Sequence, residues 1–165
     1  MDALPVLVEV ARELRDARLD AVLIGNAAAA LQGAPVTTVD FDFFFRNTPR
    51  NVAKLKAIAR GLDATVMRPY YPVSELYRVM RDRDGLQVDF MGAIHGIRSY
   101  EGLRERASSI EVGGIPLRVA SLDDIIRSKR AARRPRDRAV LEILEKARDE
   151  KSKTQRNARS GSSRE

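Results

Sequence analysis

The chain contains no cysteine and no tryptophan, and it has a single histidine among its 165 residues. The absence of cysteine excludes disulfides and thiolate metal sites. No apolar run reaches the roughly 18–20 residues that a membrane-spanning helix needs. Residues 1–20 carry charges of both signs at helical spacing, unlike a secretory signal peptide. The sequence therefore predicts a cytoplasmic protein with no membrane partner.

Charge is distributed unevenly along the chain, although the net charge is +7 and charged residues make up 32% of the sequence. Residues 127–138 hold seven basic residues and one acid, and residues 151–165 hold five basic residues and one acid. The rest of the chain is therefore net acidic. A local basic patch favours a polyanionic partner, such as a nucleoside triphosphate, RNA or both. The alternative is a solvated helix face followed by a solubilising tail.

Hydrophobic periodicity predicts an alternation of helices and strands. Helices are expected over residues 3–18, 27–31 and 48–61, from Ser121 onward, and from Pro135 to about Arg148. Strands are expected at 21–24, 38–46, 64–67, 76–80, 86–90, 109–112 and 116–120, with Asp84-Gly85 as a hairpin turn. Residues 68–72 read as a loop, and residues 97–107 are ambiguous. This order indicates an α/β (α+β) fold, a mixed sheet flanked by helices with a C-terminal helical pair.

One domain is expected over residues 1–150, because a hydrophobic content of 44% in a chain of this length suits a single core. The basic segment 151–165 has no apolar residue other than Ala158, and we expect it to be a disordered tail.

Two carboxylates, Asp40 and Asp42, stand in the otherwise apolar run 39–45. In a strand, residues two apart point to the same face, and charges in a buried strand need partners such as metal ions. Asp89 lies in another alternating strand, on the same face as Gln87. Three carboxylates on neighbouring strands predict a site for two Mg²⁺ ions, or Mn²⁺, which supports displacement at phosphorus. For Asp89 alone, the alternative is an exposed strand residue.

A possible phosphate site follows the first predicted strand, where Gly25-Asn26 precedes a predicted helix. Glycine lets a phosphate approach the free N–H groups of a helix N-terminus, although a plain tight turn is the alternative. Thr38 lies two residues before Asp40, so its hydroxyl is expected on the metal-site face. Its alternative role is simple β propensity. We hypothesise that a phosphate on Thr38 would repel an incoming nucleotide.

These motifs resemble the nucleotidyltransferases of the DNA polymerase β type. The resemblance covers about residues 20–145 and rests on Gly25-Asn26, Asp40-Phe41-Asp42 and Asp89. The segment 117–130, followed by Arg134-Pro135-Arg136-Asp137, is similar to the AbiEii/MenT group. Members of that group are nucleotidyltransferase toxins of bacterial toxin–antitoxin pairs.

The resemblance implies a polymerase β-like nucleotidyltransferase fold and a role for each matching residue. Asp40 and Asp42 would hold both metal ions, and Asp89 would hold the catalytic one and help to deprotonate the attacking hydroxyl. Lys129 would neutralise the nucleoside triphosphate, and Asp137 would orient Lys129 or the nucleotide.

Three further positions bear on nucleotide binding. Asn26 replaces the usual Gly or Ser, but its backbone N–H and its amide can still donate to phosphate. Lys129 and Arg130 stand together, and a triphosphate with about four negative charges needs such cations. By contrast, Ser128 and His95 are expected to be structural, and Arg133 and Arg136 to be solvated or in contact with RNA backbone.

The predicted function is transfer of a nucleoside monophosphate to RNA with release of pyrophosphate. The resemblance points to the 3′ acceptor end of tRNA, and to a cognate antitoxin protein as partner. One alternative is an enzyme that modifies an antibiotic or a protein. Another is an inactive RNA-binding or partner-binding module. The nucleotide, the particular tRNA and the oligomeric state are left open.

Overall fold

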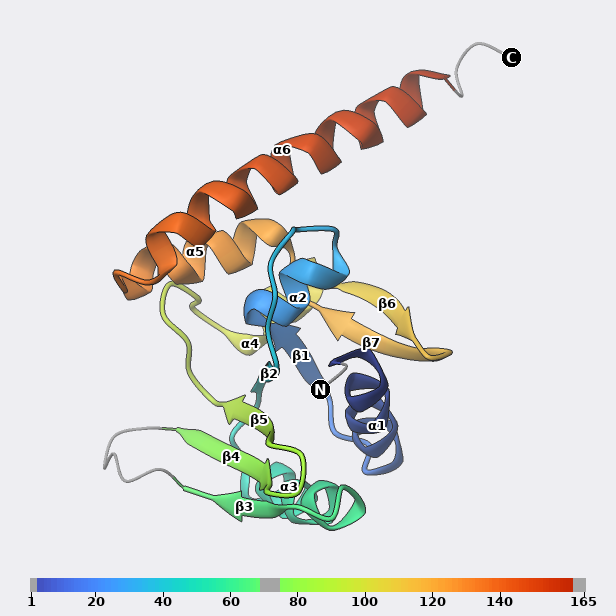
Figure 1. The fold of residues 1–165 in the computed structure, drawn as a ribbon, viewed down its shortest axis with the longest axis vertical. Helices are drawn as coiled ribbons and strands as arrows, with labels where there is room; N and C mark the ends of the chain where they lie inside the picture. The colour runs from blue at the N-terminus through green and yellow to red at the C-terminus, as the bar shows by residue number, and fades with distance from the viewer. Residues whose placement is uncertain (1–2, 69–74, 162–165) are drawn as a thin grey trace.

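The computed structural model describes residues 3–68 and 75–161, and Figure 1 shows its helices and strands. The helices are α1 (Ala3–Asp16), α2 (Gly25–Leu31), α3 (Pro49–Gly61), α4 (Tyr100–Arg106), α5 (Leu122–Ala132) and α6 (Asp137–Gly161). The strands are β1 (Ala21–Ile24), β2 (Asp40–Phe45), β3 (Thr65–Met67), β4 (Leu76–Arg81), β5 (Leu86–Met91), β6 (Ser108–Val112) and β7 (Ile115–Val119).

All of these strands join one sheet in the order β3-β4-β5-β2-β1-β7-β6. The β2–β5 and β1–β7 pairs are parallel, and the other pairs are antiparallel. The mixed sheet flanked by helices that the sequence predicts is therefore confirmed. The centre of the sheet is aromatic, because the rings of Phe43 and Phe90 stack with centroids 5.4 Å apart. Burial of these large rings fixes the position of β2 against β5.

Side-chain caps begin the helices where the sequence places them. Thr48 Oγ1 accepts a hydrogen bond from the backbone N–H of Asn51, with Pro49 in the first turn. Ser121 Oγ likewise accepts from the backbone N–H of Asp124. The ambiguous stretch 97–107 contains α4, which Ser99 caps through the backbone N–H of Gly102.

Most element boundaries lie within two residues of the sequence prediction, and two of the differences have a clear physical cause. Strand β2 begins at Asp40 and not at Thr38, because the Thr38 hydroxyl accepts from the Asp40 N–H and donates to the Asp40 carbonyl, each at 3.1 Å. Helix α6 continues through the segment 151–161, which was expected to be disordered, and this part is exposed from Ser152 to Ser160. No proline or glycine interrupts the chain between Asp137 and Gly161, so nothing ends the helix earlier.

Helix α6 extends past the rest of the molecule in Figure 1. Residues 162–165 of the predicted tail, and all but Arg68 of the predicted loop 68–72, lie outside the described residues. Among the helices that are described, none is both long and apolar enough to cross a membrane.

Candidate active site

The register of the sheet sets four residues in one row across β1, β2, β5 and β4. Ile24 pairs with Asp42, Asp42 pairs with Asp89, and Asp89 pairs with Arg78. Paired residues of neighbouring strands face the same side of a sheet. Asp42 and Asp89, which the sequence assigns to neighbouring strands, therefore face the same side of the sheet. Asp40 lies at the start of β2, opposite Gln87, and is exposed.

Repulsion within this row is visible at Asp42. The pKa of the Asp42 carboxyl is raised to about 6, chiefly by burial and also by the negative charges of Asp89 and Asp40. Lys129 and Arg134 act in the opposite direction and lower the pKa. The sheet therefore presents a partly buried acid whose charge its neighbours compensate only in part.

Because Gly25 has no Cβ, it leaves space for the Asp42 carboxylate. It is the first residue of α2 and has φ +70, in the left-handed region that favours glycine. A Cβ at this position would lie 2.7 Å from Asp42 Oδ2, closer than real contacts allow. The next residue, Asn26, has a buried Oδ1 with no hydrogen-bond partner among the described residues.

A second group of charged residues lies across from the sheet, on α5 and at the start of α6. Lys129 Nζ lies 2.9 Å from Asp137 Oδ1, and the two side chains are only 16% and 10% exposed. The resemblance places both residues in one cleft, and here they form a partly buried ion pair. Arg134 lies in the turn between the two helices.

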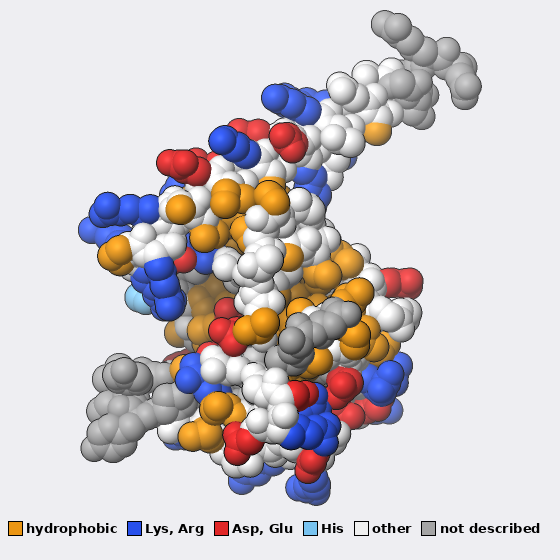
Figure 2. Space-filling view, viewed as in Figure 1, with side chains coloured by type: hydrophobic (Ala, Val, Ile, Leu, Met, Phe, Trp, Pro, Cys, Tyr) orange, Lys and Arg blue, Asp and Glu red, His pale blue; other side chains and the backbone are white. Residues whose placement is uncertain are grey.

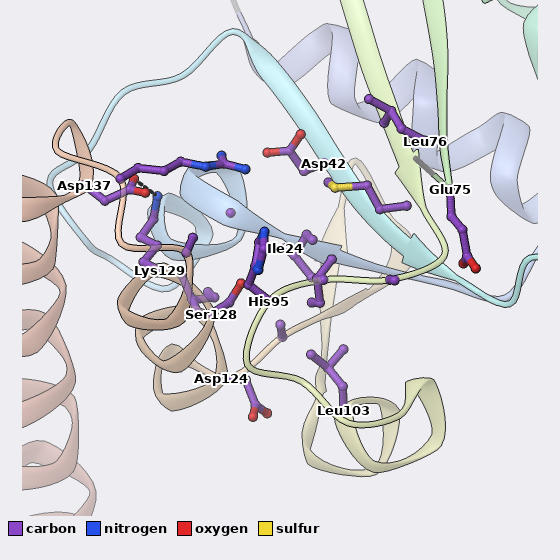
Figure 3. A pocket seen from close by; sticks show the side chains of 18 residues that line it. Ile24, Asp42, Glu75, Leu76, His95, Leu103, Asp124, Ser128, Lys129 and Asp137 are labelled. Carbon is purple, nitrogen blue, oxygen red and sulfur yellow. Dashed lines mark hydrogen bonds and ion pairs between the residues drawn. The ribbon is translucent and has the colours of Figure 1, made fainter. Parts of the chain in front are cut away.

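A cavity of about 720 Å³ connects these two groups. Figure 3 shows Asp42 on the strand side of the cavity, and Lys129 and Asp137 on the helix side. Gly25, Arg134 and the loop that follows β5 complete this end. Leu76 and the acid Glu75 lie at the far end, away from Lys129 and Asp137 (Figure 3), and the lining also includes the apolar side chains of Met91, Ile94 and Leu103.

The predicted site residues do not all line this cavity. Asp42, Gly25, Lys129 and Asp137 do, whereas Asp89, Asp40, Asn26, Arg130 and Thr38 do not. The Arg130 guanidinium forms an ion pair with Glu145 of α6.

Thr38 was expected beside the metal site, and this expectation is not met. It lines a separate apolar cavity of about 640 Å³ with Leu31, Val39 and Phe41. The reason is that β2 starts only at Asp40, so strand alternation does not extend back to Thr38.

His95 and Ser128, which were expected to be structural, both line the cavity. The His95 loop packs tightly on α5, because a Cβ on Gly96 would lie 2.8 Å from Ala131 Cβ and 2.9 Å from the Arg127 carbonyl oxygen. Gly96 also has φ +74. The two glycines that flank this histidine, at positions 92 and 96, were the available sequence signal for a closely packed loop.

Arg78 is a further residue that the sequence reasoning missed. Its guanidinium makes two hydrogen bonds to the Asp89 carboxylate, Nε to Oδ1 and Nη2 to Oδ2, both at 2.8 Å. The Gln87 amide also donates to Asp89 Oδ2, at 3.4 Å. The hydrogen bond to Asp89, with the charges of Asp89, Asp40 and Asp42, raises the pKa of Arg78 further above its usual value. The Asp84-Gly85 hairpin could have predicted this pairing, since it fixes the register of β4 against β5.

The carboxylates are suitable ligands for a divalent cation, but their side chains are not grouped closely enough to hold one together. Carboxylate oxygens are the ligands that Mg²⁺ prefers, and a cation would relieve the repulsion at Asp42. However, within residues 3–68 and 75–161, no three His, Cys, Asp or Glu side chains are placed to hold a metal ion together. Asp40 and Asp42 remain available to a cation, while Asp89 is held by Arg78.

The sequence matches, over residues 3–160, a family described as nucleotidyl transferase of unknown function, DUF2204. No curated protein matches the chain. Among solved structures, a Thermotoga maritima protein assigned to the nucleotidyltransferases is 22% identical, with a TM-score of 0.56. The match covers 96% of this chain and 92% of that one.

Two antibiotic-modifying or resistance proteins are also similar in structure. The antibiotic-resistance factor ANT(2″)-Ia has a TM-score of 0.61 at 14% identity, covering 98% of this chain and 97% of that one. The lincosamide antibiotic adenylyltransferase LnuA, solved with lincomycin, has a TM-score of 0.60 at 11% identity, covering 84% and 94%. These likenesses confirm the predicted polymerase β-like nucleotidyltransferase fold. The narrower AbiEii/MenT assignment stays a prediction.

Proposed function

Because the chain belongs to the nucleotidyl transferase family DUF2204, we propose that this enzyme transfers a nucleoside monophosphate from a nucleoside triphosphate to RNA. Pyrophosphate is the leaving group. The observation that carries the proposal is the cavity in which Asp42 faces Lys129, Arg134 and Asp137. A triphosphate bound there would have an acidic group for cations on one side and fixed positive charge on the other.

Each wall of the cavity has its own part in the reaction. Lys129 neutralises charge on the triphosphate, and its contact with Asp137 holds the ammonium group in one place before the nucleotide arrives. Arg134, which lines the same end, adds positive charge. Asp40 and Asp42, joined by Asp89, would hold Mg²⁺, which when bound neutralises the reacting phosphate and activates the acceptor hydroxyl.

Exposed arginines beside the cavity support an RNA acceptor. Arg133, Arg134, Arg136 and Arg138 are all exposed, and none forms an ion pair with a residue that the structure describes. Figure 2 shows Lys and Arg side chains near the start of α6 and along it. RNA phosphates are natural partners for such uncompensated charge. The tRNA 3′ end as acceptor, the toxin role and an antitoxin partner come from the resemblance of residues 117–137 and belong to the proposal.

A small-molecule acceptor is the second candidate. Two structures similar to this chain over most of its length are an antibiotic-resistance factor and an antibiotic adenylyltransferase. The cavity has the volume of a drug-sized site, and its far end combines apolar side chains with Glu75. A cationic drug would suit that carboxylate. No observation favours a protein acceptor, and membership of an enzyme family leaves the inactive-module alternative without support.

One assay separates the two candidates. Purified protein is incubated with Mg²⁺ and each α-labelled nucleoside triphosphate, with either total tRNA or a panel of aminoglycosides and lincosamides. Label on tRNA that disappears in Asp40→Ala supports the RNA acceptor. Label on a drug, with none on tRNA, supports the second candidate. Folded protein that labels no acceptor with any nucleotide or metal would contradict both.

A further inference from the structure

We infer that Arg78 competes with divalent metal ions for Asp89, so that the third carboxylate accepts a metal ion only when Arg78 leaves it. This inference rests on the proposed function, since that proposal gives Asp89 a metal ion to hold. The observation behind it is the two-point contact between the Arg78 guanidinium and the Asp89 carboxylate.

The contact uses both oxygens of the carboxylate. Nε and Nη2 of Arg78 each donate to a different Asp89 oxygen at 2.8 Å, the paired geometry in which arginine binds carboxylates most firmly. The Asp89 side chain is 11% exposed and that of Arg78 is 31% exposed. Water therefore screens the pair only in part, while the outer side of the guanidinium stays accessible.

Electrostatic repulsion disfavours a metal ion on Asp89 while Arg78 is still bound to that carboxylate. A metal ion on Asp89 would bind an oxygen that already accepts a hydrogen bond from Arg78. Two cations on one carboxylate oxygen repel each other strongly in a partly buried site. Arg78 therefore fills the place that a metal ion would take, and it keeps Asp89 neutralised when no metal is bound.

Asp42 provides the internal contrast. It is the partner of Asp89 in the parallel register, yet no described residue forms an ion pair or a hydrogen bond with its carboxylate. Asp42 is therefore open to a first cation, whereas Asp89 is not. We expect the free protein to bind divalent ions through Asp40 and Asp42, with Asp89 excluded until Arg78 moves.

Direct measurement of Mn²⁺ binding without nucleotide tests this inference, by electron paramagnetic resonance or calorimetry. Arg78→Gln is expected to bind Mn²⁺ at least tenfold more tightly than the unchanged protein, or to bind one additional ion. The double variant Arg78→Gln with Asp89→Asn should lose this gain, because the gain depends on the Asp89 carboxylate. Arg83→Gln is the matched control. Arg83 lies in the same hairpin, is exposed and pairs with Asp63, so its loss removes one positive charge away from the carboxylates.

Stability is measured alongside, because Asp89 without Arg78 is an unpaired, mostly buried charge. Arg78→Gln should melt at a lower temperature than the unchanged protein without metal and recover more on addition of Mn²⁺. If Arg78→Gln does not fold, Arg78→Lys keeps the charge, loses the two-point contact and should tighten Mn²⁺ binding by a smaller factor.

A purely structural Arg78 would lower the melting temperature and leave Mn²⁺ affinity unchanged. That result, or a gain that persists when Asp89 is Asn, would overturn the inference. The outcome is separable from the proposed function. Tighter Mn²⁺ binding by a protein that labels no acceptor would uphold the inference and reject the function. Labelling without any change in Mn²⁺ affinity would do the reverse.

Discussion

The two walls of the cavity treat charge in opposite ways. On the helix side, Lys129 and Asp137 form a 2.9 Å ion pair, so each buried charge has a partner. On the sheet side, Asp42 stands beside Asp89 and near Asp40, and burial with this repulsion raises its pKa to about 6. One wall is balanced without a ligand, and the other is not.

The uncompensated negative charge on the sheet side would favour a bound cation there. A fold gains nothing by keeping a repelled carboxylate in its interior, and local rules are broken most often at functional sites. Gly25 supports the same view, because its missing Cβ leaves the space that Asp42 Oδ2 occupies. In the function proposed above, the sheet wall would bind a cation and the helix wall the nucleotide phosphate that accompanies it.

Removal of the sheet-wall acid should have the largest effect. Asp42→Ala is expected to lower kcat/KM for nucleotidyl transfer by roughly 100- to 1000-fold, because charge in the transition state loses its support. The measurement is label transfer under the conditions given above. Asp82→Ala, in the exposed β4–β5 turn, is the control and should stay within about twofold. Equal losses in both variants would mean that Asp42 has no special role.

Removal of the helix-wall cation should follow. Lys129→Met is expected to reduce kcat/KM about 100-fold, since the triphosphate loses a fixed positive charge. Arg130→Met is the neighbouring change on α5, but Arg130 pairs with Glu145 outside the cavity. It should change the rate by less than about threefold. The comparison fails if Arg130 proves as important as Lys129.

Crowding of Asp42 is predicted to separate stability from activity. Gly25→Ala and Gly85→Ala both place alanine at φ +70, so each should lower the free energy of unfolding by about 1–2 kcal/mol. Only Gly25→Ala also brings a Cβ to 2.7 Å from Asp42 Oδ2, whereas nothing lies within 4 Å at Gly85. Chemical denaturation should show similar losses of stability in the two variants. The transfer assay should show a loss of activity in Gly25→Ala alone.

The repulsion at Asp42 should also be visible in stability. With a pKa of about 6 in the folded protein, Asp42 disfavours folding once it is charged, so its contribution worsens as pH rises from about 4 to 6. Asp42→Asn should therefore be about 1–3 kcal/mol more stable than the unchanged protein at pH 7, and no more stable near pH 4. Added Mg²⁺ should stabilise the unchanged protein and not the variant. A variant that is less stable at pH 7 would contradict this.

The smallest effect is expected far from both walls. Deletion of residues 151–165 removes the exposed basic end of α6 and should weaken tRNA affinity a few-fold. The dependence of affinity on salt should also flatten, by about one unit of slope per lost phosphate contact. Filter binding at several salt concentrations measures both. Unchanged affinity would leave this end of α6 without a part in RNA binding.

Much of the fold could be predicted because the hydrophobic periodicity and the turn and capping residues of the sequence agree with the tertiary structure. Alternation within each strand put Asp40 with Asp42 and Gln87 with Asp89, and the Asp84-Gly85 turn predicted the β4–β5 hairpin. The late start of β2 was missed, because Thr38 has strong β propensity but bonds to the Asp40 backbone instead. The helical continuation to Gly161 was missed because a polar composition does not by itself prevent a helix.

Individual residues of the site could be predicted from sequence motifs, but the contacts between them could not. Lys129 and Asp137 came from resemblance, and the structure adds the contact between them. The pairing of Arg78 with Asp89 depends on strand register, and the position of His95 depends on how closely Gly96 packs on α5. Both are tertiary relations between segments, which residue types alone do not specify.

A double-mutant cycle on nucleotide binding shows whether one bound nucleotide interacts with both walls of the cavity. Affinity for a non-reactive α,β-methylene nucleoside triphosphate analogue with Mg²⁺ is measured by calorimetry for the unchanged protein, Asp42→Asn, Lys129→Met and the double variant. If the nucleotide contacts both walls, the two losses of binding free energy should be coupled by at least about 1 kcal/mol. Purely additive losses, or affinity that neither change affects, would contradict this prediction.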